Sequence, residues 1–313
     1  MRIPASLASL LLVLSPVLAP AQTPACKPTI TGHVETISLA STTFHNTRNL
    51  YIWLPPGYGD AANAQKKYPV LYILDGDSAF DACGAFLHDE LHADETLTEL
   101  ITAGKIPPVI AVGIQNASDI LGHDANGQNI DGGRARSREY LPYPDDALQP
   151  VTNDVIGQQF PGFLEREVMP AVTSHFRALT GAQNSALWGD SYAGAQALYI
   201  ALHRPDLFDR VIIESPSIQA GNGQLLRDSV SLVQTPGHIA LGVGTEEAAG
   251  AHLPNEKEIS AAVVRLDRTL AANLQAAAYM PPKVQFTVGE GAHHTTSDFG
   301  KRLAAGLLFI YGK

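Results

Sequence analysis

The segment from Ala186 to Leu198 constrains the fold of this chain more than any other. It starts as a short apolar strand, passes through a turn of small residues, and continues as a helix to about His203. Gly-x-Ser at such a junction is typical of a nucleophile elbow, where a serine on a strained strand-to-helix turn exposes its hydroxyl above a sheet. Ser191 is therefore the candidate nucleophile. Ala193 stands where the motif usually has its second glycine, and alanine is still a small residue.

Apolar runs elsewhere in the chain predict a parallel sheet around this segment. Residues 70–74 and 109–114 are continuously apolar, as in strands that helices cover on both faces. Further strands are expected at residues 33–39, 49–54, 211–214, 239–243 and 284–288. Helices are expected over residues 79–103, 160–176, 259–278 and 297–311. This alternation predicts an α/β fold with a doubly wound, mostly parallel sheet and helices on both faces.

The stretch from residue 115 to residue 154 is polar and rich in glycine, asparagine and aspartate. We expect it to form a long loop, and a loop of this length in a compact domain is usually functional. No linker, repeat or low-complexity block divides residues 22–313. These residues are therefore expected to form a single domain.

The N-terminus has the features of a secretory signal peptide. Residues 1–21 carry one positive charge at Arg2, an apolar run and the small residues Ala19-Pro20-Ala21 at the expected cleavage site. Ser15 and Pro16 interrupt the run, which is also too short for a membrane anchor. We expect an exported, soluble protein, periplasmic or secreted, whose mature chain begins at Gln22.

Charge and cysteine content limit the partners and the redox state. The formal net charge is −10, and loss of the single charge of Arg2 with the leader makes it −11. A chain this acidic is not expected to bind nucleic acid or an anionic membrane. Cys26 and Cys83 are the only cysteines. In an oxidising compartment they allow one disulfide, and the sequence leaves open whether it forms.

No cofactor or metal site is expected from motifs. The sequence has no glycine-rich phosphate-binding loop, so no nucleotide cofactor is implied. His88 and His92 are four residues apart, as in a zinc metalloprotease helix. That motif needs glutamate directly after the first histidine, where this chain has Asp89.

Several segments together resemble a known family. They are the elbow, residues 51–58, the run Tyr-Pro-Val-Leu-Tyr-Ile-Leu-Asp-Gly from residue 68, residues 106–114, residues 215–217 and the pair His293-His294. In this order they resemble the putative esterase family, which includes enterochelin and other siderophore esterases, esterase D, feruloyl esterases and mycolyltransferases. The resemblance implies the α/β-hydrolase fold, with the chain order nucleophile, acid, histidine. It also implies a serine hydrolase that acts on carboxylic esters.

The elbow departs from the family pattern Gly-His-Ser-x-Gly-Gly at two positions. Asp190 replaces the histidine, and Ala193 replaces the first of the two glycines. A carboxylate at Asp190, beside the nucleophile, is expected to disfavour a serine alkoxide and a negatively charged substrate. Asp190 is therefore a candidate substrate-binding residue that limits the substrates accepted.

The resemblance also assigns a base and an acid. The family pattern of glycine, two residues, histidine and a small hydroxyl residue places the base at His294, with His293 as the alternative. The acid that orients the histidine matches Glu247, with Glu246 as the alternative. These two glutamates are equally compatible with the exposed start of a helix, where acidic residues are common.

An oxyanion hole needs fixed N–H donors. The backbone N–H of Tyr192, directly after the nucleophile, is one candidate, and that of Gly76 or Asp77, after the strand at residues 70–74, is the other. In relatives a basic residue from the long polar stretch approaches the pocket, so Arg138 is a candidate contact for an acidic or hydroxylated substrate. A solvated polar loop explains Arg138 equally well.

The expected function is an exported serine esterase acting on a small-molecule or glycan ester. An acyltransferase on the same fold differs only in the acceptor of the acyl group, and the sequence does not separate the two. An inactive, hydrolase-like ligand-binding protein is the alternative from another class, and Asp190 and Ala193 are the residues that favour it. The natural ester and the oligomeric state are not readable from the sequence.

Overall fold

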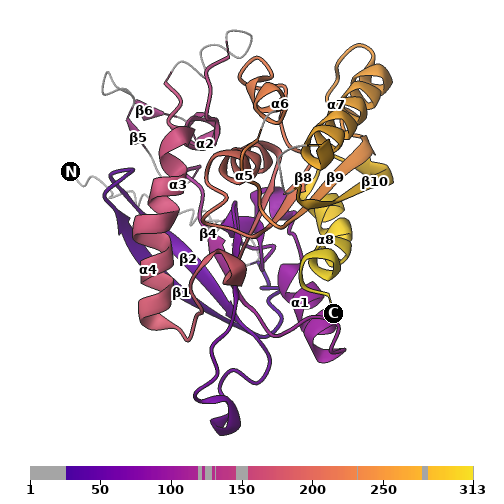
Figure 1. Cartoon of the computed structure of the whole chain (residues 1–313). Helices are drawn as coiled ribbons and strands as arrows, with labels where there is room; N and C mark the ends of the chain where they lie inside the picture. The colour runs from indigo at the N-terminus through magenta and orange to yellow at the C-terminus, as the bar shows by residue number, and fades with distance from the viewer. Residues whose placement is uncertain are drawn as a thin grey trace, which may run out of the picture.

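An eight-stranded sheet forms the centre of the molecule (Figure 1). The computed structural model describes residues 26–118, 122–123, 129–130, 132–145, 154–230, 232–276 and 281–312. The strand order is β1-β2-β4-β3-β7-β8-β9-β10, and β5 (Gly122–His123) pairs separately with β6 (Asn129–Ile130). The large sheet consists of β1 (His33–Ser41), β2 (Asn46–Leu54), β3 (Val70–Ile73), β4 (Ile110–Ile114), β7 (Ser185–Asp190), β8 (Arg210–Glu214), β9 (His238–Glu246) and β10 (Lys283–His293).

The predicted doubly wound, mostly parallel sheet is confirmed. Within the described part of the large sheet, only β1 against β2 and β2 against β4 run antiparallel. From β4 to β10 every neighbouring pair in the large sheet is parallel. The carboxyl ends of β3, β7, β8, β9 and β10 therefore meet at one edge, where ligand sites of such sheets form.

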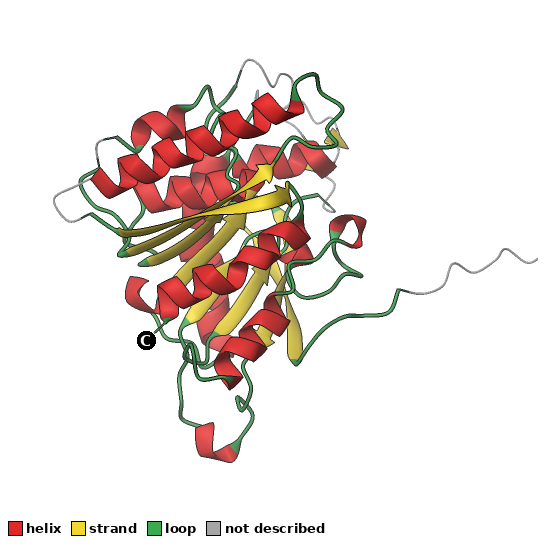
Figure 2. Ribbon diagram, turned by 90° about the vertical axis from the view of Figure 1, so that its right-hand side faces the viewer, coloured by secondary structure: helices red, strands yellow, loops and turns green. Residues whose placement is uncertain are grey.

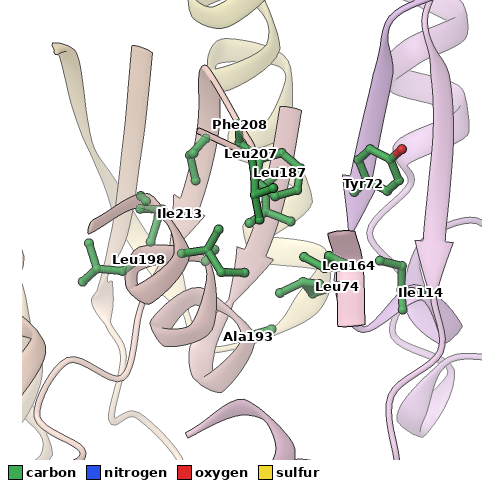
Figure 3. Close-up of a cluster of buried hydrophobic side chains, with 14 of the residues drawn as sticks. Tyr72, Leu74, Ile114, Leu164, Leu187, Ala193, Leu198, Leu207, Phe208 and Ile213 are labelled. Carbon is green, nitrogen blue, oxygen red and sulfur yellow. The ribbon is translucent and has the colours of Figure 1, made fainter. Parts of the chain in front are cut away.

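Helices cover both faces of the sheet (Figure 2). Successive residues of β3 alternate between two hydrophobic cores: Val70 and Tyr72 lie in one, Leu71 and Ile73 in the other. The first core, part of which Figure 3 shows, packs against helices that precede and follow the elbow, and the second packs against α1 and α8.

The α-helices are α1 (Ala93–Thr102), α2 (Gly132–Tyr140), α3 (Phe160–Phe163), α4 (Met169–His175), α5 (Ser191–His203), α6 (Gln224–Asp228), α7 (Glu256–Ala276) and α8 (Thr296–Tyr311). A π-helical turn (Leu164–Val168) joins α3 to α4.

The helix expected over residues 79–103 is wrong in its first half. After the 3₁₀ turn η2 (Gly76–Ser78), the chain there forms another short 3₁₀ turn, η3 (Phe86–His88), before α1 begins at Ala93. Leu87, His88 and His92 have positive φ angles of 54°, 58° and 56°. Left-handed backbone at these residues interrupts a helix. The Asp81 side chain holds the turn by accepting from the backbone N–H of Cys83 at 3.0 Å.

The long loop expected over residues 115–154 contains a helix, α2. Its exposed positions are polar and hide the helical period, but Ala135 and Tyr140 are 6% and 1% exposed. The Tyr140 ring packs on Phe160 of α3 with centroids 5.3 Å apart. Glu139 accepts hydrogen bonds from the buried Arg48 guanidinium of β2 at 2.8 and 3.0 Å. Tertiary contacts therefore stabilise α2 where the sequence shows no amphipathic pattern.

The N-terminal arm of the described chain is linked to the segment after β3. Cys26 and Cys83 form a disulfide across a separation of 57 residues, so the structure contains the pairing that the sequence left open. The predicted leader, residues 1–21, lies outside the described residues. Within the described part of the chain, no helix has the length and apolar character needed to cross a bilayer.

Removal of the disulfide should destabilise the fold through the unfolded state. A cross-link that closes a loop of this size restricts the unfolded chain, and we expect the double variant Cys26→Ser, Cys83→Ser to lose about 2–4 kcal/mol in free energy of unfolding. Urea unfolding of this variant beside the oxidised and reduced wild type measures the effect. Equal midpoints for all three would contradict the expectation.

Candidate active site

The elbow is a strained turn that only small residues permit. Ser191 follows β7 directly, opens α5 and has a positive φ of 52°. A Cβ at Gly189 would lie 2.4 Å from the carbonyl oxygen of Ala193, and one at Gly194 would lie 2.9 Å from that of Glu214. Ala193 itself is fully buried in the core (Figure 3). Its methyl group thus fills space where the family usually has glycine.

Three side chains from three strand ends form a continuous hydrogen-bonded line. Ser191 Oγ lies 2.9 Å from Nε2 of His294, which follows β10. The other ring nitrogen of His294, Nδ1, lies 2.6 Å from Oε2 of Glu247, which follows β9. An ionised carboxylate only accepts hydrogen bonds, so Nδ1 is the protonated nitrogen and Nε2 is free to accept from the serine. This is the arrangement in which a histidine removes a hydroxyl proton.

The alternative residues His293 and Glu246 have different surroundings from His294 and Glu247. His293 and Glu246 are register partners at the ends of β10 and β9. The backbone N–H of His293 donates to Asp298 at 2.6 Å, and its ring Nδ1 lies 3.4 Å from the same carboxylate. The structure thus brings His294 to Ser191 and directs His293 towards α8.

The Glu247 carboxylate is buried and fully hydrogen-bonded. Its side chain is 3% exposed, and Oε1 accepts from Ser215 Oγ and from the backbone N–H of Gly244, each at 2.6 Å. Burial by itself raises the pKa of Glu247, but the bonds from His294, Ser215 and Gly244 outweigh it and lower the pKa below its ordinary value. Glu247 is therefore an ionised anchor for the imidazole at neutral pH.

A second buried ion pair supports Ser215. Arg302 of α8 donates from Nε to Glu214 Oε2 at 2.7 Å and from Nη2 to Ser215 Oγ at 3.3 Å. The pKa of Glu214 is raised to about 7, because its burial outweighs the attraction of Arg302. Ser215 belongs to a segment that the sequence analysis noted, but its bond to Glu247 and the role of Arg302 were missed. Only the packing of α8 against β8 and β9 brings these groups together.

The candidate oxyanion-hole donors lie at the same edge of the sheet. Tyr192 is in the first turn of α5, where backbone N–H groups have no acceptor within the helix. Ile73 pairs with Trp188 across β3 and β7, so Gly76 and Ser191 each follow the paired residues by three positions. A Cβ at Gly76 would lie 2.2 Å from the backbone of Gly113, so only glycine fits this approach.

The Asp77 side chain is turned to another partner. Its Oδ2 accepts from the backbone N–H of Asn116 at 3.0 Å. This bond fixes the start of η2 against the end of β4. The backbone N–H of Asp77, not its carboxylate, remains the candidate donor.

Arg136, not Arg138, is the arginine next to the elbow. Arg136 donates to both oxygens of Asp75 at 2.9 and 2.5 Å, and its guanidinium lies 5.7 Å from the Tyr192 ring centroid. Arg138 donates to Asp154 at 2.9 Å instead, and its contact with a substrate stays a prediction. Residues two apart on a helix point in nearly opposite directions, and no local pattern in the sequence distinguishes the two arginines.

Asp190 does not have the predicted substrate-binding environment. It is 7% exposed, and its carboxyl group lies within hydrogen-bonding reach of Asp75. Burial first, and then the charge of Asp75, raise the pKa of Asp190 to about 7 against the opposing effects of Arg136 and His294. Below that pH the group is mostly neutral, so the expected negative charge beside Ser191 is largely absent.

Comparisons of the sequence and of the structure with known proteins both find esterases. The model of the family described as "Putative esterase" matches residues 41–310. A siderophore triacetylfusarinine C esterase from Aspergillus fumigatus is 30% identical over 181 residues, which cover 58% of this chain and 55% of that protein. The chain thus spans about half the length of this curated relative.

Solved structures show the same fold. The BES protein from Bacillus cereus has a TM-score of 0.66 and 21% identity, covering 92% of this chain and 99% of that one. Siderophore hydrolase EstB from Aspergillus nidulans has a TM-score of 0.64 and 19% identity, covering 94% and 98%. The enterobactin esterase FES from Shigella flexneri has a TM-score of 0.63 and 20% identity, covering 91% and 60%. The fold is therefore of the α/β-hydrolase type, as the resemblance implied.

The raised pKa of Asp190 should make its effect on stability depend on pH. The folded-state value of about 7 exceeds the ordinary 3.8, so Asp190 favours folding at low pH and loses this contribution as pH rises through 7. Asn cannot ionise and can still donate to Asp75. We compare the free energy of unfolding of Asp190→Asn with that of wild type. The difference should shift in favour of the variant by at least about 1 kcal/mol between about pH 5 and about pH 8. Urea unfolding at both pH values tests this, and an equal difference at each would contradict it.

Proposed function

Because the chain belongs to the putative esterase family, we propose that it is a serine carboxylesterase that works through an acyl-enzyme on Ser191. The observation that carries the proposal is the hydrogen-bonded line from Glu247 through His294 to Ser191, with links of 2.6 and 2.9 Å. The lowered pKa of Glu247 keeps this carboxylate ionised, as its proposed role requires. The strained turn leaves the hydroxyl at the edge of the sheet where the other two side chains converge.

In the first half of the reaction Ser191 Oγ attacks the ester carbonyl carbon. His294 Nε2 takes the hydroxyl proton, and Glu247 stabilises the imidazolium that results. The backbone N–H groups of Tyr192 and of Gly76 or Asp77 stabilise the negative charge on the carbonyl oxygen. His294 then protonates the leaving alcohol as the carbon–oxygen bond breaks, which leaves an acyl group on the serine.

In the second half a water molecule takes the place of the alcohol. His294 accepts its proton, the hydroxide attacks the acyl carbon, and the proton returns to Ser191 as the acid is released. If an alcohol entered at this step, the same residues would perform acyl transfer. The two outcomes differ only in the acceptor.

Relatives that act on siderophores make siderophore esters the first natural substrates to test. One is named a siderophore triacetylfusarinine C esterase, and structural neighbours are named siderophore hydrolase and enterobactin esterase. Aryl esters and acylated sugars are further candidates. We propose a small-molecule or glycan ester as the substrate class.

Export is the second part of the proposal. The leader features of residues 1–21 support it. So does the Cys26–Cys83 disulfide, because such bonds persist mainly in oxidising compartments.

Hydrolysis of p-nitrophenyl acetate and butyrate by paired variants tests the catalytic roles. Ser191→Ala should remove turnover, and Glu247→Gln should lower kcat by about 10²–10⁴-fold, because the glutamine no longer selects the required tautomer. His294→Ala should be inactive within the detection limit. The matched controls are Glu246→Gln and His293→Ala, which should stay within about threefold of wild type.

Two results would contradict the esterase assignment. Wild-type hydrolysis no faster than that of Ser191→Ala, on short and on aromatic esters alike, would favour a binding protein. Acyl transfer to an added alcohol that exceeds hydrolysis in water would favour an acyltransferase.

N-terminal sequencing tests the export proposal. When the full chain is expressed in a bacterium with a secretory pathway, the protein from the periplasm or medium should begin at Gln22. A retained Met1 in the fractionated protein would contradict cleavage. Replacing the Ala19-Pro20-Ala21 segment with bulky residues should leave the precursor uncut.

A further inference from the structure

A second convergence of polar side chains lies where the N-terminal arm meets the start of α1. Glu90, His92 and Glu95 each place one ligand-type atom there, and the three atoms lie within 4.8 Å of one another. None of these residues takes part in the hydrogen-bonded line at Ser191. The cluster is therefore separate from the proposed esterase chemistry.

The N-terminal arm holds one oxygen of each glutamate and leaves the other free. Thr29 Oγ1 donates to Glu90 Oε2 at 2.7 Å, and Thr31 Oγ1 donates to Glu95 Oε1 at 3.2 Å. The remaining oxygens, Glu90 Oε1 and Glu95 Oε2, are buried and accept no hydrogen bond. The Glu90 side chain is 2% exposed, so solvent does not satisfy its free oxygen. Buried carboxylate oxygens that accept no hydrogen bond are costly.

The free oxygens both face the ring of His92. Nδ1 of His92 lies 2.8 Å from Glu90 Oε1 and 3.7 Å from Glu95 Oε2. The shorter separation is that of an ion pair if His92 is protonated, and no hydrogen bond joins the two atoms. Two ligand atoms of one ion, each about 2.1 Å from it, lie about 3.0–3.4 Å apart. The observed separations bracket that range.

The charge around the cluster also calls for a cation. Asp94, fully buried beside Glu95, accepts from the backbone N–H of Thr31 at 2.5 Å, while its Oδ1 has no hydrogen-bond partner. Asp94 thus adds a third carboxyl group next to Glu95, while Glu90 and Glu95 are the two that face the imidazole. Among the residues that the structure describes, no lysine or arginine forms an ion pair with any of the three. Burial of a charged carboxylate such as that of Glu90 without a cation nearby is unfavourable.

We propose that Glu90, His92 and Glu95 bind a divalent first-row metal ion, with Zn²⁺ as the probe. Two carboxylate oxygens and one imidazole nitrogen are donors that suit Zn²⁺ and similar ions, whereas Ca²⁺ prefers oxygen ligands alone. His92 is 55% exposed and Glu95 is 39% exposed, which leaves one side open for water ligands. The sequence motif paired His92 with His88, but the Nδ1 atom of His88 lies 2.9 Å from the carbonyl oxygen of Ala82.

The bound ion would fasten the N-terminal arm to α1. Thr29 and Thr31 hold the ligands, and the Cys26–Cys83 disulfide closes the same region. The preceding residue, Asp89, accepts from the backbone N–H groups of Thr296 and Ser297 at 2.7 and 3.1 Å. These residues follow His294 closely, so the metal site and the histidine loop are supported by one short segment.

Titration of the EDTA-treated and desalted mature protein tests the proposal. Calorimetry should show one Zn²⁺ per chain, and saturating Zn²⁺ should raise Tm by at least about 3 °C. His92→Asn and Glu95→Gln should each weaken binding at least tenfold. Asn is chosen because it tolerates the left-handed backbone of His92, whose φ is 56°. Melting without metal establishes that both variants are folded.

His88→Asn is the matched control. It removes an exposed histidine with a similar φ of 58° from the same segment but outside the cluster, and it should bind Zn²⁺ as wild type does. No Zn²⁺ uptake by wild type would overturn the proposal and leave a histidinium and shared protons as the explanation of the cluster. Uptake that His92→Asn and Glu95→Gln leave unchanged would overturn it in favour of another surface site. Ser191→Ala should bind Zn²⁺ normally, so this outcome is independent of the esterase test.

Discussion

The left-handed turn at Ser191 is the constraint on which the site depends. The serine has a positive φ of 52°, and the turn closes only because Gly189 and Gly194 lack side chains that would strike the backbone. The parallel register of β3, β7, β8 and β9 then brings the ends of neighbouring strands to the same edge. Ser191, His294 and Glu247, the candidate nucleophile, base and acid, thus meet from distant parts of the chain. The cost of the strained turn is offset by the helix and the sheet that hold it from both sides.

Two arginine–carboxylate pairs lie near the site, Arg302 with Glu214 and Arg136 with Asp75. Behind Glu247, Ser215 links the acid to the Arg302–Glu214 pair. In front, Arg136 neutralises Asp75, which in turn raises the pKa of Asp190. The pKa values of the two nearby carboxyl groups shift in opposite directions. Hydrogen bonds lower the pKa of Glu247 and keep it ionised, whereas burial raises the pKa of Asp190 and favours its neutral form. Asp190 therefore places no fixed charge beside Ser191, the candidate nucleophile, at lower pH.

The segment between β3 and α1 contacts both the N-terminal arm and the start of α8. It begins with the candidate oxyanion donors after β3, carries Cys83 of the disulfide, and ends at the cluster around His92. Asp89 within it holds the start of α8, close to His294. Its left-handed residues and 3₁₀ turns are the reason that a helix predicted from composition is absent there. The tight turns bring side chains from α1, α8 and the N-terminal arm into contact.

The sequence by itself determined the elbow, the strands of the large sheet, most of the helices and the order of the candidate residues, because these features depend on neighbours a few positions apart. It ranked His294 above His293 and Glu247 above Glu246 by resemblance, but gave no physical reason for the ranking. That reason is tertiary: Ser191 and His294 are 103 residues apart, and only the register of β10 against β9 turns one of two adjacent histidines towards the serine. The choice of Arg136 over Arg138, the pKa of Asp190 and the grouping of Glu90, His92 and Glu95 were likewise decided by the folded structure. Burial and electrostatic fields come from groups far apart in the chain, so no local pattern records them.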